Sequence, residues 1–221
     1  MFRGLFITGT DTDVGKTTVA AALMHRYRGL KALKYWKPIQ TGIELSDDTV
    51  TVEKLGACSQ HELHPAGTRL PRPVAPYLAA ELTGIRIAIS DLLLPGLNEP
   101  DSVRWVAEGA GGVLVPINES ESMVDLMSAM GMPVLVVARS SLGTINHTLL
   151  TLESLRRCRL DLAGVVMVGD KNEANRKAIE DFGSVSVIAE LPYLAELTPE
   201  TLGRWATSEF DMQGQLARYF K

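Results

Sequence analysis

The sequence predicts an α/β fold, a doubly wound and mostly parallel sheet with helices on both of its faces. Two observations support this prediction. Short runs of β-branched and other apolar residues alternate with longer helical patterns along the chain. These runs lack the strict two-residue alternation of a half-exposed sheet, which is typical of parallel strands buried on both faces. A chain of 221 residues fits one domain, which we expect to span residues 1–221.

Six apolar runs are predicted to form the strands. They comprise residues 5–8, 32–36, 103–108, 134–138, 163–168 and 186–188. Four helical patterns are long enough to cross back over a sheet. They comprise residues 16–28, 123–130, 144–157 and 173–182. Prolines interrupt residues 68–100 around a helix-like stretch at 77–82, so we expect this segment to lie outside the main sheet.

Composition and charge argue against several classes of function. The chain has 22 basic and 26 acidic residues and no long run of like charges, so we expect no nucleic-acid partner. The N-terminal apolar run is too short for a signal peptide or a membrane span, which predicts a cytoplasmic protein with no membrane partner. Cys58 and Cys158 are expected to be reduced thiols without a catalytic role.

A glycine-rich loop, residues 9–17, follows the first predicted strand and opens the first predicted helix. Its sequence is Gly-Thr-Asp-Thr-Asp-Val-Gly-Lys-Thr, and this context is the one that a phosphate-binding loop requires. Glycines let successive N–H groups point inward, and the helix N-terminus adds positive potential. Lys16 is predicted to reach the outer phosphates, and the Thr17 hydroxyl to bind Mg²⁺. A glycine turn that merely caps a helix is the alternative.

Acidic residues occur at two places near this loop. Asp11 and Asp13 lie inside it, and carboxylates repel phosphate unless a cation lies between them. We therefore expect a cationic group nearby, with solvated acids on a turn as the alternative. Asp47 and Asp48 precede a helix-like segment, where helix capping is the simpler interpretation.

Polar groups follow two further strands at the edge where ligands of open parallel sheets bind. Residues 37–42, Lys-Pro-Ile-Gln-Thr-Gly, follow the second strand, and residues 108–112, Glu-Gly-Ala-Gly-Gly, follow the third. An apolar run that ends in an acid is typical of a Mg²⁺ ligand facing a phosphate loop. The glycines behind Glu108 let the backbone approach a ligand closely.

Together these segments resemble one family, the dethiobiotin synthetases of the P-loop NTPase superfamily. The match covers most of the chain through its motifs at residues 9–17, 37–42, 108–112 and 142–147, which follow the family's order. The resemblance implies a P-loop NTPase-like fold and an ATP- and Mg²⁺-dependent homodimeric ligase of biotin biosynthesis. Its substrates would be CO₂ and 7,8-diaminononanoate. One amine forms a carbamate, the carbamate takes the γ-phosphoryl group, and the second amine closes the cyclic urea of dethiobiotin.

The resemblance also implies roles for individual residues. Lys16 and Lys37 would be the catalytic cations that hold the carbamate and the γ-phosphate. Thr17, Asp48 and Glu108 would bind the metal ion, with Asp47 as the alternative to Asp48. The residues implied to bind the nucleotide are Asp13, Val14, Gly15, Lys16, Thr17, Thr18, Asp48, Glu108, Gly109, Ala110, Gly111, Gly169, Asp170, Pro192, Tyr193 and Leu194. The residues implied to bind the substrate are Thr12, Lys37, Thr41, Gly143, Thr144 and Asn146. The last three belong to a helix start that would receive the substrate carboxylate across the dimer interface.

Two positions depart from the family's pattern. Asp13 occupies a position where the family often has the longer Glu. Gly169-Asp170 occupies a position where many members have Asn-Asp to read adenine, so base selectivity is expected to be loose or to depend on Asn172.

Other phosphate-loop functions fit less well. ATP-driven partitioning switches usually have a second lysine early in the loop, where this chain has Thr10. The remaining residues cannot hold the glutaminase domain of an amidotransferase, and the Asn-Lys-x-Asp guanine motif of GTPases is absent. A small-molecule binder without catalysis stays open. Phosphate release that depends on diamine and bicarbonate would decide between these functions.

Overall fold

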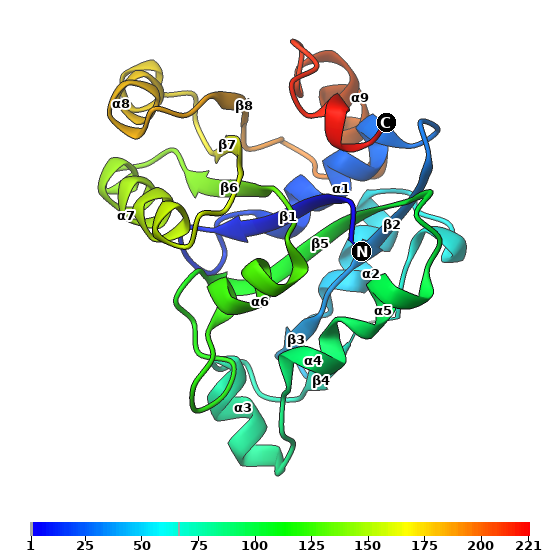
Figure 1. The fold of residues 1–221 in the computed structure, drawn as a ribbon. Coiled ribbons are helices and arrows are strands. Elements are labelled where there is room, and N and C mark those ends of the chain that lie inside the picture. The colour runs from blue at the N-terminus through cyan, green and yellow to red at the C-terminus, as the bar shows by residue number, and fades with distance from the viewer. Residues whose placement is uncertain (1, 66) are drawn as a thin grey trace.

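Six parallel strands form the main sheet, in the order β2-β5-β1-β6-β7-β8 (Figure 1). The computed structural model describes residues 2–65 and 67–221. The strands are β1 (Gly4–Gly9), β2 (Ala32–Trp36), β5 (Val103–Gly112), β6 (Val134–Arg139), β7 (Leu162–Val168) and β8 (Val187–Leu191). Every pair of neighbours runs parallel, which confirms the predicted sheet.

Helices cover both faces of this sheet (Figure 1). On one face lie α1 (Lys16–Tyr27), α2 (Asp48–Leu55) and α9 (Pro199–Ser208). On the other face lie α6 (Met123–Met130), α7 (Thr144–Arg157) and α8 (Glu173–Gly183). The four predicted helices correspond to α1, α6, α7 and α8. The fold class is therefore confirmed.

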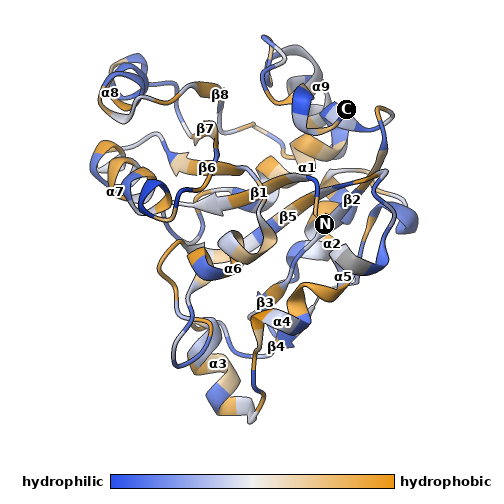
Figure 2. Cartoon of the chain, in the orientation of Figure 1, coloured by the Kyte–Doolittle hydropathy of each residue, from blue (hydrophilic) through white to orange (hydrophobic). Residues whose placement is uncertain are grey.

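Each side of the sheet has its own apolar core, because successive side chains of a strand point to opposite faces. In β1, Leu5 and Ile7 lie in the core beneath α1, whereas Phe6 lies in the core beneath α6 and α7. All six residues of β1 are buried. Figure 2 shows hydrophobic residues along the strands and hydrophilic ones over much of the outer helices. Burial on both faces explains why the strand sequences show no polar alternation.

The proline-rich excursion begins with β4 (Thr68–Leu70), which pairs with β3 (Ile39–Thr41) as a second, two-stranded parallel sheet. It continues through α3 (Pro76–Thr83), α4 (Ile89–Leu92) and α5 (Leu94–Asn98). Residues 68–100 thus lie outside the main sheet as predicted, and the helix-like stretch at 77–82 lies in α3.

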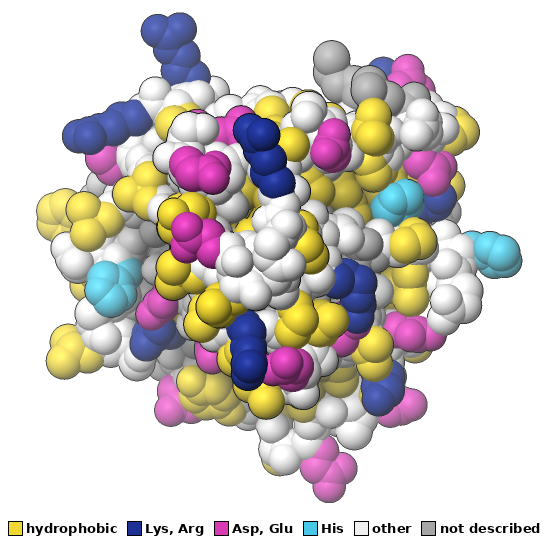
Figure 3. All heavy atoms as spheres, turned by 90° about the horizontal axis from the view of Figure 1, so that it is seen from below, with side chains coloured by type: hydrophobic (Ala, Val, Ile, Leu, Met, Phe, Trp, Pro, Cys, Tyr) yellow, Lys and Arg dark blue, Asp and Glu magenta, His cyan; other side chains and the backbone are white. Residues whose placement is uncertain are grey.

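Figure 3 shows one face of the molecule, on which acidic and basic side chains are interspersed among apolar ones.

Several boundaries differ from those predicted. β5 runs to Gly112, beyond the predicted end at residue 108, because it continues to pair with Gly9 of β1. β8 begins one residue later and ends three residues later than predicted. Two short 3₁₀ helices, η1 (Gln60–Glu62) and η2 (Ala217–Tyr219), complete the elements of the described residues.

Two further predictions from the sequence concern the cysteines and membrane-spanning helices. Both cysteines are free thiols. Within residues 2–65 and 67–221, no helix has the length and apolar character needed to cross a membrane.

The strand order changes direction at β1. The chain leaves β1 for β2 on one side and returns later to β6 on the other side. In open α/β sheets, ligands bind at such a switch point, outside the carboxyl ends of the strands. The loop that follows β1 therefore lies at this position, between the ends of β5 and β6.

Candidate active site

The loop after β1 turns sharply into α1. Gly15 adopts φ 98° and ψ 19° at the start of the helix, a left-handed conformation that glycine reaches at low cost. A Cβ at this position would meet the Val168 side chain at 3.1 Å. Lys16 is buried, and its Nζ donates to the Asp11 carbonyl oxygen at 2.8 Å. The lysine side chain thus folds back over its own loop.

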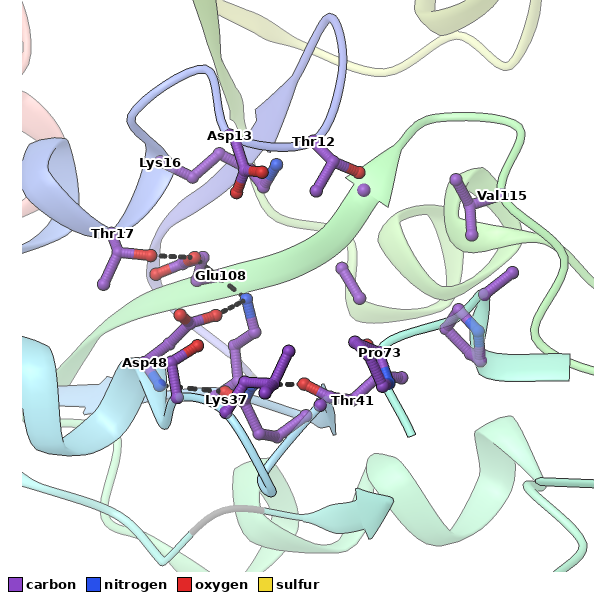
Figure 4. Close-up of a pocket in the computed structure, with 18 of the residues that line it drawn as sticks. Thr12, Asp13, Lys16, Thr17, Lys37, Thr41, Asp48, Pro73, Glu108 and Val115 are labelled. Atoms are coloured by element: carbon purple, nitrogen blue, oxygen red, sulfur yellow. Dashed lines mark hydrogen bonds and ion pairs between the residues drawn. The ribbon is translucent and has the colours of Figure 1, made fainter. Parts of the chain in front are cut away.

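A buried ion cluster lies opposite this loop (Figure 4). Lys37 Nζ lies 2.6 Å from Asp48 Oδ2 and 2.9 Å from Glu108 Oε1. The Thr17 hydroxyl donates to the same Glu108 oxygen at 2.9 Å. The Lys37 and Glu108 side chains are 3% and 0% exposed. The starts of α1 and α2, the residue that follows β2, and Glu108 within β5 therefore bring their polar groups to one point.

Strand register explains why Lys37 meets Glu108. β2 pairs with β5 so that Tyr35 faces Val106 and Trp36 faces Ala107. Tyr35 and Lys37 share one face of the strand, because side chains repeat every two residues. The Tyr35 hydroxyl donates to Glu108 Oε2 at 2.9 Å. Sequence reasoning missed this tyrosine, because within an apolar run it is indistinguishable from an ordinary core residue.

Burial and charge shift the pKa values of the ionisable groups here. Burial and the ammonium of Lys37 lower the pKa of Lys16. Burial also disfavours the charged form of Lys37, but Glu108 and Asp48 outweigh it and raise the Lys37 pKa. Burial and the charge of Glu108 raise the Tyr35 pKa well above its ordinary value. Lys37 thus stays charged, and Lys16 is the cation that an incoming polyanion would stabilise most.

The two neighbouring acids, Asp47 and Asp48, have different partners. Asp47 caps α2 by accepting from the Thr49 N–H at 2.9 Å, and it pairs with Arg69 of β4 at 2.5 Å. The Asp48 carboxylate instead faces Lys37, and the Asp48 N–H donates to Gln40 Oε1 at 3.1 Å. Helix capping therefore belongs to Asp47, and the carboxylate in the cavity is that of Asp48.

These groups line one cavity of about 660 Å³, a size typical of small-molecule sites. The predicted site residues that line it are Thr12, Asp13, Gly15, Lys16, Thr17, Thr18, Lys37, Thr41, Asp48, Glu108, Ala110 and Gly111. Sequence reasoning did not assign its apolar wall, formed by Leu45, Pro73, Val74, Ala75, Pro76 and Val115. Figure 4 shows Pro73 and Val115 on the side of the cavity away from Thr17. The cavity thus combines a charged end with an apolar side.

The other predicted site residues lie outside this cavity. They are Val14, Gly109, Gly143, Thr144, Asn146, Gly169, Asp170, Pro192, Tyr193 and Leu194. The Val14 side chain is part of the core beneath α1, and the Gly109 carbonyl accepts from Lys37 at 3.0 Å. Thr144 is buried, with its hydroxyl 3.4 Å from that of Thr148, while Asn146 is exposed. The α7 start does not join the cavity within one chain.

The backbone and the surroundings of Gly169 disfavour any side chain at this position. Its φ of 125° is rare for residues with a side chain, and a Cβ there would lie 2.4 Å from Ser140 Oγ. Tyr193, 74% exposed, lies on the other side, 3.5 Å from the same Cβ position. The alternative reader, Asn172, caps α8 by accepting from the Asn175 N–H at 3.0 Å. Its carboxamide oxygen is therefore already engaged.

A cation lies beside the acids of the loop, as expected. Arg139, at the end of β6, contacts Asp11 Oδ2 at 2.8 Å. Both side chains are partly exposed, and exposed ion pairs contribute on the order of 0–1 kcal/mol to stability. The pair therefore serves mainly to compensate the Asp11 charge next to the phosphate loop.

The donor set around Glu108 suits a hard divalent cation. Thr17, Asp48 and Glu108 offer one hydroxyl and two carboxylates, and Mg²⁺ in nucleotide sites takes few protein oxygens beside phosphates and water. Among the described residues, no group of three or more His, Cys, Asp or Glu could hold a metal ion by itself.

Comparison with known proteins identifies the family. A family model described as an AAA domain matches residues 3–201. The chain is 49% identical over 212 residues to the ATP-dependent dethiobiotin synthetase BioD of Paramagnetospirillum magneticum, covering 96% of this chain and 98% of that protein. The chain belongs to the dethiobiotin synthetase family. The predicted family and enzyme class, an ATP-dependent cyclo-ligase of biotin biosynthesis, are thereby confirmed.

Other relatives of this chain support the same family assignment. BioD of Agrobacterium fabrum is 42% identical, over 93% of each chain. The bifunctional protein BioCD of Bordetella avium is 44% identical over 92% of this chain, which corresponds to 42% of that protein. Solved structures of a ParA family ATPase from Chlorobium tepidum and of MinD from Pyrococcus horikoshii each give a TM-score of 0.57, at 11% and 13% identity. They cover 93% and 100% of the synthetase and 98% and 93% of their own chains. At this identity they concern the fold alone, and they confirm a P-loop NTPase-like architecture.

Proposed function

We propose that the chain converts 7,8-diaminononanoate, CO₂ and ATP into dethiobiotin, ADP and phosphate. The observation that carries the proposal is the meeting of Lys16 and Thr17 of the phosphate loop with Lys37, Asp48 and Glu108 in one cavity. A phosphate loop alone would serve any nucleotide-binding function. The second buried cation, supplied from another strand, suits a second anion beside the γ-phosphate.

The reaction needs two anions to be held next to each other. The lone pair of one substrate amine attacks the carbon of CO₂, and loss of a proton leaves a carbamate. A carbamate oxygen then attacks the γ-phosphorus while its bond to ADP breaks. The second amine attacks the carbonyl carbon, phosphate leaves, and a further proton is lost as the ring closes. Adjacent cations favour the phosphoryl step, because they stabilise charge where it develops.

The residues of the cavity match these needs. Lys16 and Lys37 both line the cavity, and in this proposal Lys16 holds the γ-phosphate and Lys37 the carbamate. The carboxylate of Asp13 and the hydroxyls of Thr12 and Thr41 line the same space, where they suit the amines and the carbamate. The apolar wall around Pro73 to Pro76 suits the aliphatic chain between the reacting amines and the substrate carboxylate.

Mg²⁺ belongs to the proposal as the ion that neutralises phosphate charge when bound. Thr17, Asp48 and Glu108 would hold it. Lys37 bridges the same two carboxylates. We propose the nucleotide base beside Gly169, Asp170 and the segment 192–194 at the ends of β7 and β8.

We further propose a homodimer with shared active sites. Gly143, Thr144 and Asn146 at the start of α7 would receive the substrate carboxylate in the opposite subunit's cavity. Exposed apolar side chains lie near this helix start: Leu142, before the helix, is 100% exposed, and Leu150, within it, is 62% exposed. Exposed apolar side chains suit burial against a second copy. The functional unit would be one synthetase domain of residues 1–221 per subunit, acting in the cytoplasm.

The test is phosphate release under steady state together with identification of the product. ATP, the diamine and ¹³C-bicarbonate should all be required, and the cyclic urea should contain the label. Phosphate release at the same rate with and without the diamine would point to an ATP-driven switch. Binding of nucleotide without any turnover would point to a binding protein.

A further inference from the structure

Glu108 is the most enclosed acid of the cavity, and its two carboxylate oxygens have different partners. Oε1 accepts from Thr17 at 2.9 Å and contacts Lys37 at 2.9 Å. Oε2 accepts only from Tyr35 at 2.9 Å among the contacts of the described residues. The terminal torsion of a glutamate is broad, so the side chain has little preference of its own for this orientation. The hydroxyl of Tyr35 supplies the missing constraint.

Tyr35 lies behind the cavity. It is fully buried in the core beneath α1 and does not line the cavity. It precedes Lys37, the first residue after β2, by two positions, so one short segment carries both the group that holds Oε2 and the cation that pairs with Oε1. A bond between β2 and β5 side chains thus sets the orientation of the carboxylate that Thr17 and Lys37 share.

We propose that Tyr35 is a positioning residue for phosphoryl transfer, which keeps Glu108 Oε1 directed at Thr17 and Lys37. The inference rests on the proposed function of this site. If the hydroxyl is removed, Oε2 becomes a buried acceptor without a donor, and the carboxylate turns to find one. Lys37 and any metal ion held at Oε1 then lose their fixed partner. Phosphoryl transfer slows, while recognition of the rest of the nucleotide is unchanged.

Tyr27 offers a matched control. It is buried in the same core, and its hydroxyl donates to the Asp211 carboxylate. Neither residue lines the active-site cavity. Tyr27→Phe therefore removes the same atom from the same kind of bond, away from the phosphate loop. A purely structural role for Tyr35 would make the two variants behave alike.

The experiment compares Tyr35→Phe with Tyr27→Phe in turnover and in calorimetric binding of a non-hydrolysable ATP analogue, with and without Mg²⁺. In Tyr35→Phe we expect kcat to fall about 10- to 100-fold, as for a lost hydrogen bond to a charged group. The increase in analogue affinity that Mg²⁺ provides should shrink about tenfold, with metal-free affinity within about twofold of the parent. Tyr27→Phe should change neither. Parent-like kcat and Mg²⁺ response in Tyr35→Phe, or equal losses in both variants, overturns the inference.

Glu108→Gln separates this inference from the function on which it rests. If Tyr35 acts through Glu108, the double variant Tyr35→Phe/Glu108→Gln is no slower than Glu108→Gln alone. Additive losses overturn the positioning role. Full turnover in Glu108→Gln contradicts the site assignment itself, whereas an inactive Glu108→Gln beside a normal Tyr35→Phe rejects only the role of Tyr35.

Discussion

At the scale of single residues, the two cavity lysines are held differently. Lys37 is paired with two carboxylates, whereas Lys16 donates to a backbone carbonyl and lies near a second cation. A lysine without a carboxylate partner can exchange its contact for phosphate at little cost. Lys16 is therefore the residue whose removal should abolish chemistry while leaving the ion cluster intact.

Lys16→Ala should give a folded protein whose turnover falls by about two to three orders of magnitude or more, because a cation aimed at developing phosphoryl charge is lost. Phosphate release measures the effect, and circular dichroism checks the fold. Lys177→Ala, on the exposed face of α8, is the control and should be normal. Near-normal turnover of Lys16→Ala would reject the assignment of the phosphate loop.

We expect nucleotide selectivity to depend on the residue at position 169. Gly169 has no side chain to contact the base, and the side-chain oxygen of Asn172 is already engaged. We therefore expect GTP and CTP to support turnover within about tenfold of ATP, because one discriminating contact contributes about 1.4 kcal/mol. The measurement is kcat/KM for the three nucleotides. An ATP preference above about a hundredfold shows that another group reads the base. Ser140→Ala then tests the hydroxyl beside Gly169.

At the scale of elements, sequence reasoning found all six strands of the main sheet, because each is a buried apolar run between longer helical patterns. It missed β3 and β4, which have three residues each and show no period. It also missed α9 and the apolar wall. The wall comes from a proline-rich segment whose position depends on contacts such as Arg69 with Asp47, and no local pattern reveals such a contact.

Sequence reasoning also identified part of the candidate site and missed other parts of it. Glycine and lysine spacing identified the loop, and the strand ends gave Lys37 and Glu108. The choice between Asp47 and Asp48 required the capping geometry of α2, and Tyr35 required the pairing register of β2 with β5. Both features depend on tertiary structure, because they are set by which side chains a helix start or a strand presents to its neighbours.

The start of α2 allows capping and chemistry to be separated. Asp47→Ala should lower stability by about 1–2 kcal/mol through loss of the N-cap and leave most turnover, whereas Asp48→Ala should lose turnover. Urea unfolding and phosphate release measure the two effects. Equal loss of turnover in both variants would contradict this division of roles.

The Asp47 effect should also depend on pH. Burial alone would raise the Asp47 pKa, but hydrogen bonds from Arg69 and the α2 backbone outweigh it and lower the pKa below 3.8. A lowered carboxylate pKa stabilises the folded state above the unfolded-state value, and this stabilisation is lost as pH falls through the folded-state value. The difference in unfolding free energy between the parent and Asp47→Ala should therefore be full near neutral pH and shrink in acid below about pH 4.

At the scale of the whole molecule, the α7 start lies outside the cavity of its own chain, so the proposed dimer has a direct test. Asn146→Ala should raise the diamine KM, with a cost of about 1.5 to 3 kcal/mol for a lost hydrogen bond to a carboxylate, and should hardly change ATP binding. When Asn146→Ala subunits are mixed with inactive Lys37→Ala subunits, about a quarter of all sites should regain both residues after random exchange. Once exchange is demonstrated independently, a mixture that equals the sum of its parents would refute shared sites.

The strand order also has a consequence for how the protein is made. β1 leaves the ribosome before its neighbours β5 and β6, which begin at Val103 and Val134. At about 5–20 residues per second, the phosphate loop therefore waits several seconds for the strands that flank it. During that interval β1 is an apolar segment without its native partners, exposed to chaperones and to other nascent chains. The cavity is complete only after Glu108 and Val115 have emerged, so a ligand that needs the whole cavity is unable to assist the earliest stage of folding.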